Sequence, residues 1–333
     1  MTAPMTESAP AVEQVPEGTA PPLPWDLAES GAALPPSARP GRSLHGGPRL
    51  LRRLAEGQED RPYELFRLRP LGPLIGAEIT GVDLEEPLSA RVREELHRAL
   101  LEWKVLFFRD QWISHEQHLA FARNWGELEQ QRVTLTGADA GVARYVKDAA
   151  HAGFENAWHV DMTGRPRPAM GFVLRLLKGP RAAGDTLFAD AAAAYDNLPE
   201  TVREQLGGLR AVHDLTATMG PFVPAEQVAR IRERFPPVVH PVVRTHPETG
   251  RRTLFVNSVF TDRVVDMEPE RGERLLQYLF RELQAPEYQV RFSWTAGAVA
   301  FWDNRAVQHY AVNDYFPAPR VTERVAIAGD VPY

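Results

Sequence analysis

The sequence contains no cysteine. This absence excludes a disulfide framework, a thiolate zinc site, an iron–sulfur cluster and a cysteine nucleophile. No stretch approaches the roughly 20 consecutive apolar residues that a membrane-spanning helix needs. The N-terminus also lacks the basic and apolar segments of a secretory signal. We therefore expect a cytoplasmic protein that has no membrane partner.

The chain has no excess of basic residues either. Lys and Arg total 38 and Asp and Glu total 44, which gives a formal net charge of −6. Electrostatic attraction to nucleic acid therefore has no support, and we expect a small-molecule partner instead. Glycine-rich loops of the kind that bind nucleotide phosphates are also absent. The 333 residues, 44% hydrophobic and 25% charged, have the composition of an ordinary globular protein.

The first 60 residues differ from the rest, because they hold ten of the 29 prolines. Proline at this density favours extended, solvated backbone over regular hydrogen-bonded structure. We therefore predict a flexible extension over residues 1–60, in which residues 47–55 have the pattern of one short helix, and a single domain over residues 61–333. The alternative for the extension is a flap over the active site.

From residue 61 onward, short apolar segments alternate with turn residues and a few helical patterns. Ser89 and Ser114 each stand before such a pattern, and Ser114 with Gln117 forms a capping-box sequence. Many short strands with few helices predict a β-sandwich or barrel with helices outside it. The expected strands cover residues 66–71, 76–82, 105–108, 242–245, 253–257, 289–294, 298–302 and 324–328, and the expected helices begin after Ser89, after Ser114 and at Arg271.

The segment around residues 158–161 carries the strongest chemical signal. In an extended strand, residues i and i+2 point to the same side, so His159 and Asp161 can offer a nitrogen and an oxygen to one metal ion. His309 is the candidate third ligand. Two histidines and one carboxylate leave coordination positions open, as in non-haem Fe(II) oxygenases, and would also suit a hydrolytic zinc ion. Taken alone, each histidine could instead be an ordinary buried histidine that binds no metal.

A second group of polar residues follows His309. Arg320 and Arg324 lie four residues apart in a strand-like pattern, so both side chains face the same side. Two guanidinium groups that point into one cavity match the geometry of carboxylates. The alternative is a pair of solvated arginines that bind Glu323 or Asp330. Thr186 could add a hydroxyl donor.

Taken together, these motifs resemble the taurine/2-oxoglutarate dioxygenase (TauD/TfdA-like) family over residues 66–333. The resemblance implies an α+β, mainly β fold: a double-stranded β-helix (jelly-roll, cupin-like) core with flanking helices. The motifs that carry it are PLGPLIGAEITG at 70–81, FRDQ at 108–111, WHVD at 158–161, GDTL at 184–187, HP at 240–241, WDNR at 302–305 and QHY at 308–310.

The resemblance also implies the cofactors and the reaction. It implies that Fe(II) is held by His159, Asp161 and His309, and that Thr186 and Arg320 bind the distal carboxylate of the co-substrate 2-oxoglutarate. Oxygen is the second co-substrate. The implied reaction is oxidation, most often hydroxylation, of a substrate C–H bond, with release of succinate and CO2. The family leads us to expect a homo-oligomer.

The residues at the family's substrate-contact positions depart from the taurine-specific pattern. Histidine, tyrosine, asparagine and phenylalanine would be expected where Gln131, Thr134, Glu155 and Met219 stand, respectively. We therefore expect a small-to-medium anionic substrate other than taurine, in natural-product biosynthesis, with a taurine or alkylsulfonate/alkylsulfate dioxygenase in sulfur acquisition as the alternative. A zinc hydrolase and a non-catalytic binding protein are rivals of another class. The expected substrate contacts are Gln131, Thr134, Glu155, Met162, Met219, Phe260 and Arg324, the last of which could instead bind the near carboxylate of 2-oxoglutarate.

Overall fold

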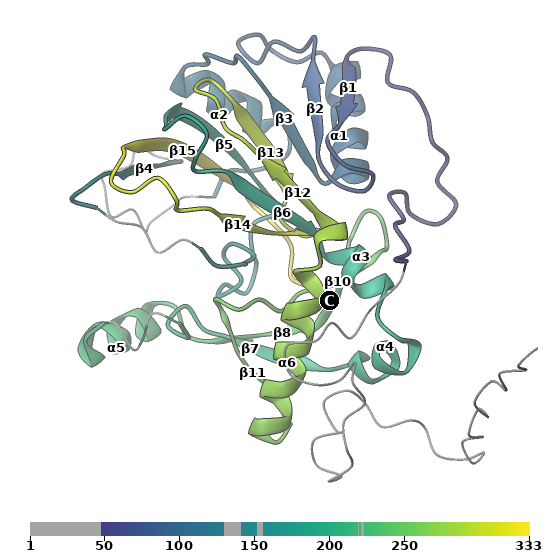
Figure 1. Cartoon of the computed structure of the whole chain (residues 1–333), viewed down its shortest axis with the longest axis vertical. Helices are drawn as coiled ribbons and strands as arrows, with labels where there is room; N and C mark the ends of the chain where they lie inside the picture. The colour runs from purple at the N-terminus through teal and green to yellow at the C-terminus, as the bar shows by residue number, and fades with distance from the viewer. Residues whose placement is uncertain (1–47, 130–140, 152–155, 219, 221–222) are drawn as a thin grey trace, which may run out of the picture.

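The computed structural model describes residues 48–129, 141–151, 156–218, 220 and 223–333 (Figure 1). Four of the expected substrate contacts, Gln131, Thr134, Glu155 and Met219, lie outside these residues. Among the described residues, every helix is too short or too polar to cross a bilayer.

The largest sheet has seven strands in the order β1-β2-β3-β13-β5-β15-β4. All neighbouring strands are antiparallel except β2 and β3. The strand order brings the C-terminal strand β15 between two strands from the middle of the chain. The bounds are β1 Arg67–Pro70, β2 Ala77–Thr80, β3 Val105–Phe108, β13 Val299–Asp303, β5 Gly171–Lys178, β15 Arg320–Ile327 and β4 Val142–Lys147.

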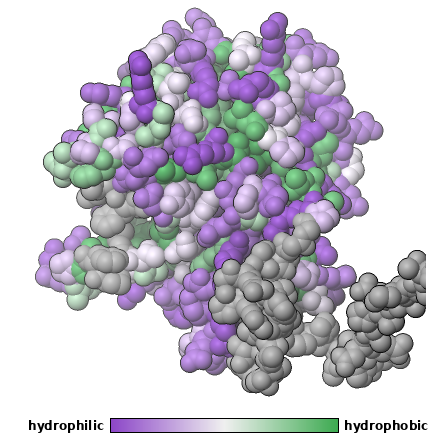
Figure 2. Space-filling model, in the orientation of Figure 1, coloured by the Kyte–Doolittle hydropathy of each residue, from purple (hydrophilic) through white to green (hydrophobic). Residues whose placement is uncertain are grey.

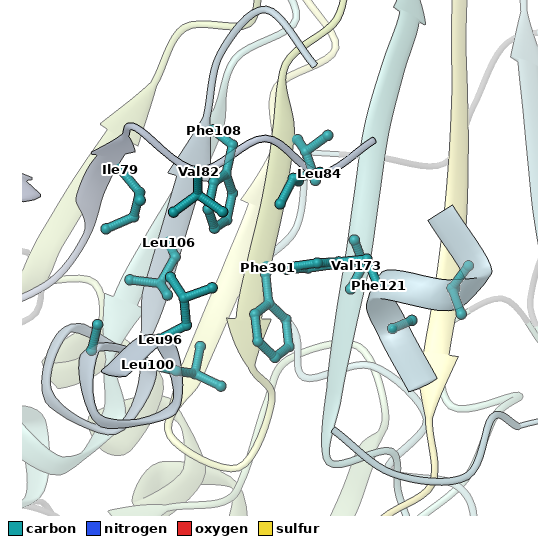
Figure 3. Close-up of a cluster of buried hydrophobic side chains, with 14 of the residues drawn as sticks. Ile79, Val82, Leu84, Leu96, Leu100, Leu106, Phe108, Phe121, Val173 and Phe301 are labelled. Carbon is teal, nitrogen blue, oxygen red and sulfur yellow. The ribbon is translucent and has the colours of Figure 1, made fainter. Parts of the chain in front are cut away.

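Helices α1 (Ala90–Trp103) and α2 (His115–Arg123) cover one face of this sheet (Figure 1). Ser89 caps α1, and the predicted capping box of Ser114 and Gln117 opens α2. The apolar side chains of both helices pack on those of the central strands, as Figure 3 shows for Leu96, Leu100 and Phe301. Both helix predictions are therefore confirmed.

The opposite face of the large sheet packs against a smaller sheet of order β12-β6-β14. The two faces explain why strand β3 is buried at every position: Phe108 points toward the helices, and Phe107 stacks on Phe292 of the small sheet at 3.9 Å between ring centroids. Two facing sheets with helices outside form the predicted jelly roll. The bounds are β12 Gln289–Phe292, β6 Thr186–Asp190 and β14 Val307–Ala311.

A second hydrophobic cluster gathers around α6 (Pro269–Leu283), below the two sheets (Figure 1). The strands expected at 242–245 and 253–257 form a hairpin, in which β9 (Val243–Thr245) pairs with β10 (Arg252–Leu254). The remaining elements are β7 Arg210–His213, β8 Val238–Pro241, β11 Thr261–Val264, α3 Ala191–Asp196, α4 Glu200–Leu206, α5 Ala225–Arg234 and a 3-10 turn Pro286–Tyr288.

The short helix predicted near residues 47–55 is wrong for the described residues 48–55, which have no regular secondary structure. Arg49 pairs with Glu282 of α6, whereas Arg53 pairs with Glu102 of α1 and lies 4.7 Å from the ring centroid of Trp103. A helix would place residues 49 and 53 on one face. Ion pairs to two different helices instead hold this segment in an irregular conformation.

Hydrophilic side chains cover much of the surface that Figure 2 shows.

Candidate active site

His159 and His309 are brought together by backbone pairing. The two residues form an antiparallel bridge, in which the amide of each donates to the carbonyl of the other, at N–O distances of 3.0 and 2.9 Å. Directly opposed residues in such a bridge point to the same side. The ring centroids of the two imidazoles are accordingly 4.2 Å apart. His309 is fixed in turn by strand β14, where it lies opposite Phe188 of β6.

Asp161 joins the two histidines through a turn and not through the predicted extended strand. Only His159 of this segment forms a bridge, and Asp161 begins a turn. The side chain of Asn304 holds that turn: its amide donates to the carbonyl of Asp161 at 3.0 Å and to that of Ala169 at 3.1 Å, and its oxygen accepts from the amide of Asp161 at 3.3 Å. Asn304 is therefore a site residue that the strand argument missed.

The three side chains form a compact set of potential metal ligands. The carboxylate oxygens of Asp161 lie 3.9 Å from Nε2 of His159 and 3.5 Å from Nε2 of His309. One ligand atom from each residue lies within 4.8 Å of the others. Nδ1 of His159 donates to the carbonyl of Ala157 at 2.9 Å, which turns the lone pair of Nε2 toward the cluster.

The electrostatics of the cluster also favour a metal ion. Burial and, next, the neighbouring His159 lower the pKa of His309 to about 3, so this imidazole is neutral at pH 7. Burial alone would raise the pKa of Asp161, but Arg324 and the two histidines outweigh it and lower the pKa to about 2. A neutral imidazole and an ionised carboxylate are the protonation states in which these groups bind metals. The residues present therefore fit Fe(II).

Arg320 and Arg324 lie on strand β15 and line the same cavity as the three ligand candidates. The alternative in which they are solvated partners of Glu323 or Asp330 is wrong. Glu323 pairs with Arg175 at 2.6 Å and Asp330 pairs with a different arginine, Arg244. Arg324 instead donates to the carboxylate of Asp161 at 2.5 Å and to the hydroxyl of Tyr145 at 2.8 Å.

Thr186 faces this cavity from strand β6. Its hydroxyl oxygen accepts from Nε1 of Trp294 at 2.9 Å, so the hydroxyl proton remains available for another acceptor. The cavity has a volume of about 280 Å³. Its described lining residues are Tyr145, Lys147, His159, Asp161, Leu174, Thr186, Phe188, Trp294, Trp302, His309, Ala311, Arg320, Thr322 and Arg324.

Besides Arg324, two of the expected substrate contacts lie within the described residues and near the metal-ligand candidates. The ring of Phe260 meets that of His159 edge-on, at 6.4 Å between centroids. Met162 follows Asp161 and packs on the hydrophobic cluster between the two sheets. Tyr145, Lys147 and Trp294 were not among the predicted site residues, and only the alternation of inward-facing residues along β4 could have indicated the first two.

The interior of this jelly roll brings two imidazoles and a carboxylate to one point, beside two arginines. This arrangement is typical of the mononuclear metal-dependent oxygenases. The chain belongs to the TauD/TfdA family: residues 67–326 match the profile described as "Taurine catabolism dioxygenase TauD, TfdA family". It is therefore an oxidoreductase, a dioxygenase that uses Fe(II), 2-oxoglutarate (α-ketoglutarate) and O2 on a small molecule. The zinc hydrolase and the non-catalytic binding protein are excluded.

Several similar proteins have names that indicate their substrates. The chain is 37% identical to the alpha-ketoglutarate-dependent sulfate ester dioxygenase of Pseudomonas putida, over 80% of this chain and 90% of that protein. It is 33% identical to the alpha-ketoglutarate-dependent 2,4-dichlorophenoxyacetate dioxygenase of Cupriavidus pinatubonensis, over 72% and 90%. A crystal structure of a taurine dioxygenase from Burkholderia xenovorans matches with a TM-score of 0.71 and 36% identity, over 81% and 93%.

Proposed function

We propose that His159, Asp161 and His309 hold the Fe(II) of this dioxygenase, and that Arg320 and Thr186 bind the distal carboxylate of 2-oxoglutarate. The observation that carries this proposal is the close approach of two imidazoles and a carboxylate inside a cavity that also contains cationic side chains. When bound, iron supplies the oxidation of a substrate C–H bond with O2, as 2-oxoglutarate is converted to succinate and CO2.

The protein's own groups position the candidate ligands and shield them from water. The carbonyl of Ala157 fixes the orientation of the His159 ring, and Asn304 fixes the backbone of Asp161. Phe188 and Trp302 line the cavity beside His309 and keep water from that side of the ligand set. Arg324 donates to Oδ2 of Asp161, so a bound metal ion and this guanidinium would share the carboxylate.

We propose that the substrate carries an anionic group that binds Arg324. The charges of the described residues that line the cavity support this proposal: Lys147, Arg320 and Arg324 bring three positive charges and Asp161 brings one negative charge. Fe(II) adds two positive charges, and 2-oxoglutarate brings only two negative ones. A cationic excess therefore remains for an anionic substrate.

Alkyl sulfate esters are the first candidates, because the sulfate ester dioxygenase of Pseudomonas putida and the alkylsulfatase of Acinetobacter baylyi are 37% and 36% identical to this chain. A natural-product intermediate is the second candidate, because the pentalenolactone F synthase of Streptomyces avermitilis is 28% identical to this chain. Taurine should be a poor substrate, since Gln131 and Thr134 replace the contacts expected for it.

The test is a screen for substrate-stimulated succinate formation with Fe(II), 2-oxoglutarate and O2. The panel contains sulfate esters, sulfonates, aryloxy carboxylates, terpenoid carboxylates and uncharged analogues of each, and products are identified by mass. We expect stimulation only by anionic compounds, and none with the His309→Ala variant. Equal turnover of anionic and uncharged analogues would overturn the proposed role of Arg324. Efficient turnover of taurine would contradict the expectation that taurine is a poor substrate.

Three further assignments are part of this proposal. The dioxygenase domain spans residues 61–333 and residues 1–60 form an extension to it. The protein acts in the cytoplasm on small molecules, without nucleic-acid or membrane partners. It forms a homo-oligomer, which light scattering of the full chain measures directly.

A further inference from the structure

The register of the large sheet sets Lys147 opposite Arg320. Strands β4 and β15 are antiparallel neighbours, and Lys147 is the Cα partner of Arg320 (Figure 1). Side chains of directly opposed residues lie on the same face of a sheet. Tyr145 lies two residues before Lys147 and therefore on the same face, and its hydroxyl oxygen accepts a hydrogen bond from Arg324 within the cavity at 2.8 Å. Lys147 accordingly lines the cavity with both arginines.

Three cationic side chains thus meet on one wall. Partial burial and, next, the nearby guanidiniums of Arg320 and Arg324 together lower the pKa of Lys147 to about 8. Arg320 is only 8% exposed, and burial likewise lowers its pKa. Like charges that converge in a partly buried site destabilise it until an anion binds between them. The wall therefore has the electrostatic character of an anion site.

Lysine is rare in this chain, which makes its position here distinctive. The sequence contains only Lys104, Lys147 and Lys178. Lys104 is buried and pairs with Asp190 at 3.1 Å. Lys178 ends strand β5, is exposed, and is not among the described residues that line the cavity.

We propose that Lys147 acts with Arg320 as a two-cation anchor for the distal carboxylate of 2-oxoglutarate. The register favours this carboxylate over an anionic substrate group, because Lys147 is opposite Arg320, whereas Arg324, next to Asp161, is opposite Ala143. This inference rests on the proposed role of Arg320. It makes Lys147 a specificity residue that selects 2-oxo diacids over 2-oxo acids that lack the distal carboxylate.

The test measures binding and not turnover. The full chain is loaded with Mn(II) in the absence of O2 and titrated calorimetrically with 2-oxoglutarate and with 2-oxopentanoate, which has the same carbon chain without the distal carboxylate. Lys147→Met should weaken 2-oxoglutarate binding on the order of 10- to 100-fold, the loss expected for a charge-assisted contact, and leave 2-oxopentanoate binding unchanged. Lys147→Arg should retain most of the affinity.

Lys178→Met is the matched control, since it removes the same charge from an exposed lysine at the end of β5 that does not line the cavity. This variant should bind both acids as the wild type does. Lys147→Gln repeats the test with a polar side chain, in case Lys147→Met does not fold. Equal weakening of both acids, or of neither, would overturn the inference. An unchanged 2-oxoglutarate affinity with a raised KM for an anionic substrate would assign Lys147 to the substrate. A wild type that does not bind 2-oxoglutarate would overturn the proposed function itself.

Discussion

Replacing Asn304 by alanine should weaken metal binding although Asn304 is not a metal ligand. The side chain is 1% exposed and makes three hydrogen bonds, two of them to the backbone of Asp161. At about 1 kcal/mol each, their loss should lower the free energy of unfolding by ~2–4 kcal/mol, since the backbone groups they satisfy stay buried. For a chain of this size that corresponds to a fall in Tm of roughly 3–6 °C.

The same change should affect the metal site, because Asn304 holds the amide and the carbonyl of Asp161 at once. Loss of a group that orients a ligand typically costs about 10- to 100-fold in metal affinity. Calorimetric titration of the full chain with Mn(II) measures this effect. Asn197→Ala is the matched control: Asn197 makes a similar set of three bonds, to both backbone groups of Leu50 and to the carbonyl of Ala193. It should lose stability and keep its metal affinity.

The reasoning would be refuted if Asn304→Ala lost stability but bound Mn(II) as tightly as the wild type. In that case the position of Asp161 would be determined by the ligands and the metal alone. Equal losses of metal affinity in Asn304→Ala and Asn197→Ala would also refute it, because the effect would then follow overall stability and not the support of Asp161.

Three further predictions concern the candidate metal ligands, the co-substrate site and the buried side chain of His213. Alanine at His159, Asp161 or His309 should abolish both turnover and Mn(II) binding. The far-UV circular dichroism spectrum of each variant should match that of the wild type. A variant that keeps full activity would show that the replaced residue is not a metal ligand. Arg320→Ala should raise the KM for 2-oxoglutarate about 10- to 100-fold, through loss of a charge-assisted bond of about 1.5–3 kcal/mol, and an unchanged KM would reassign the anchor. His213, whose ring nitrogens have no hydrogen-bond partner among the described residues, has a pKa that burial lowers to about 3. Since the unfolded chain binds this proton near pH 6.5, stability should fall as the pH drops from about 6.5 toward 3, by up to ~1.4 kcal/mol per pH unit. His213→Phe, whose ring can stack on Phe255 as the imidazole does, should reduce this slope in urea titrations, and an unchanged slope would contradict the assignment.

The amino-acid sequence by itself determined the local elements and the chemistry of the site. Ser89 and Ser114 began the helices they were expected to begin, and the apolar segment at 105–108 became a strand that is buried on both faces. These signals are local, because a cap or an apolar period depends on residues within a few positions of one another. The residue types at 159, 161 and 309 likewise indicated a metal-ligand set before any geometry was known.

Tertiary structure decided everything that depends on pairing between distant segments. The His159–His309 bridge joins residues 150 positions apart, and Asn304 supports Asp161 across 143 positions. These long-range contacts, and not the strand-like spacing of residues 159 and 161, bring the three candidate ligands together. The register that sets Lys147 opposite Arg320 also follows from how β4 and β15 align in the sheet. Such contacts are fixed by the packing of two sheets on a shared core, which no local period of the sequence encodes.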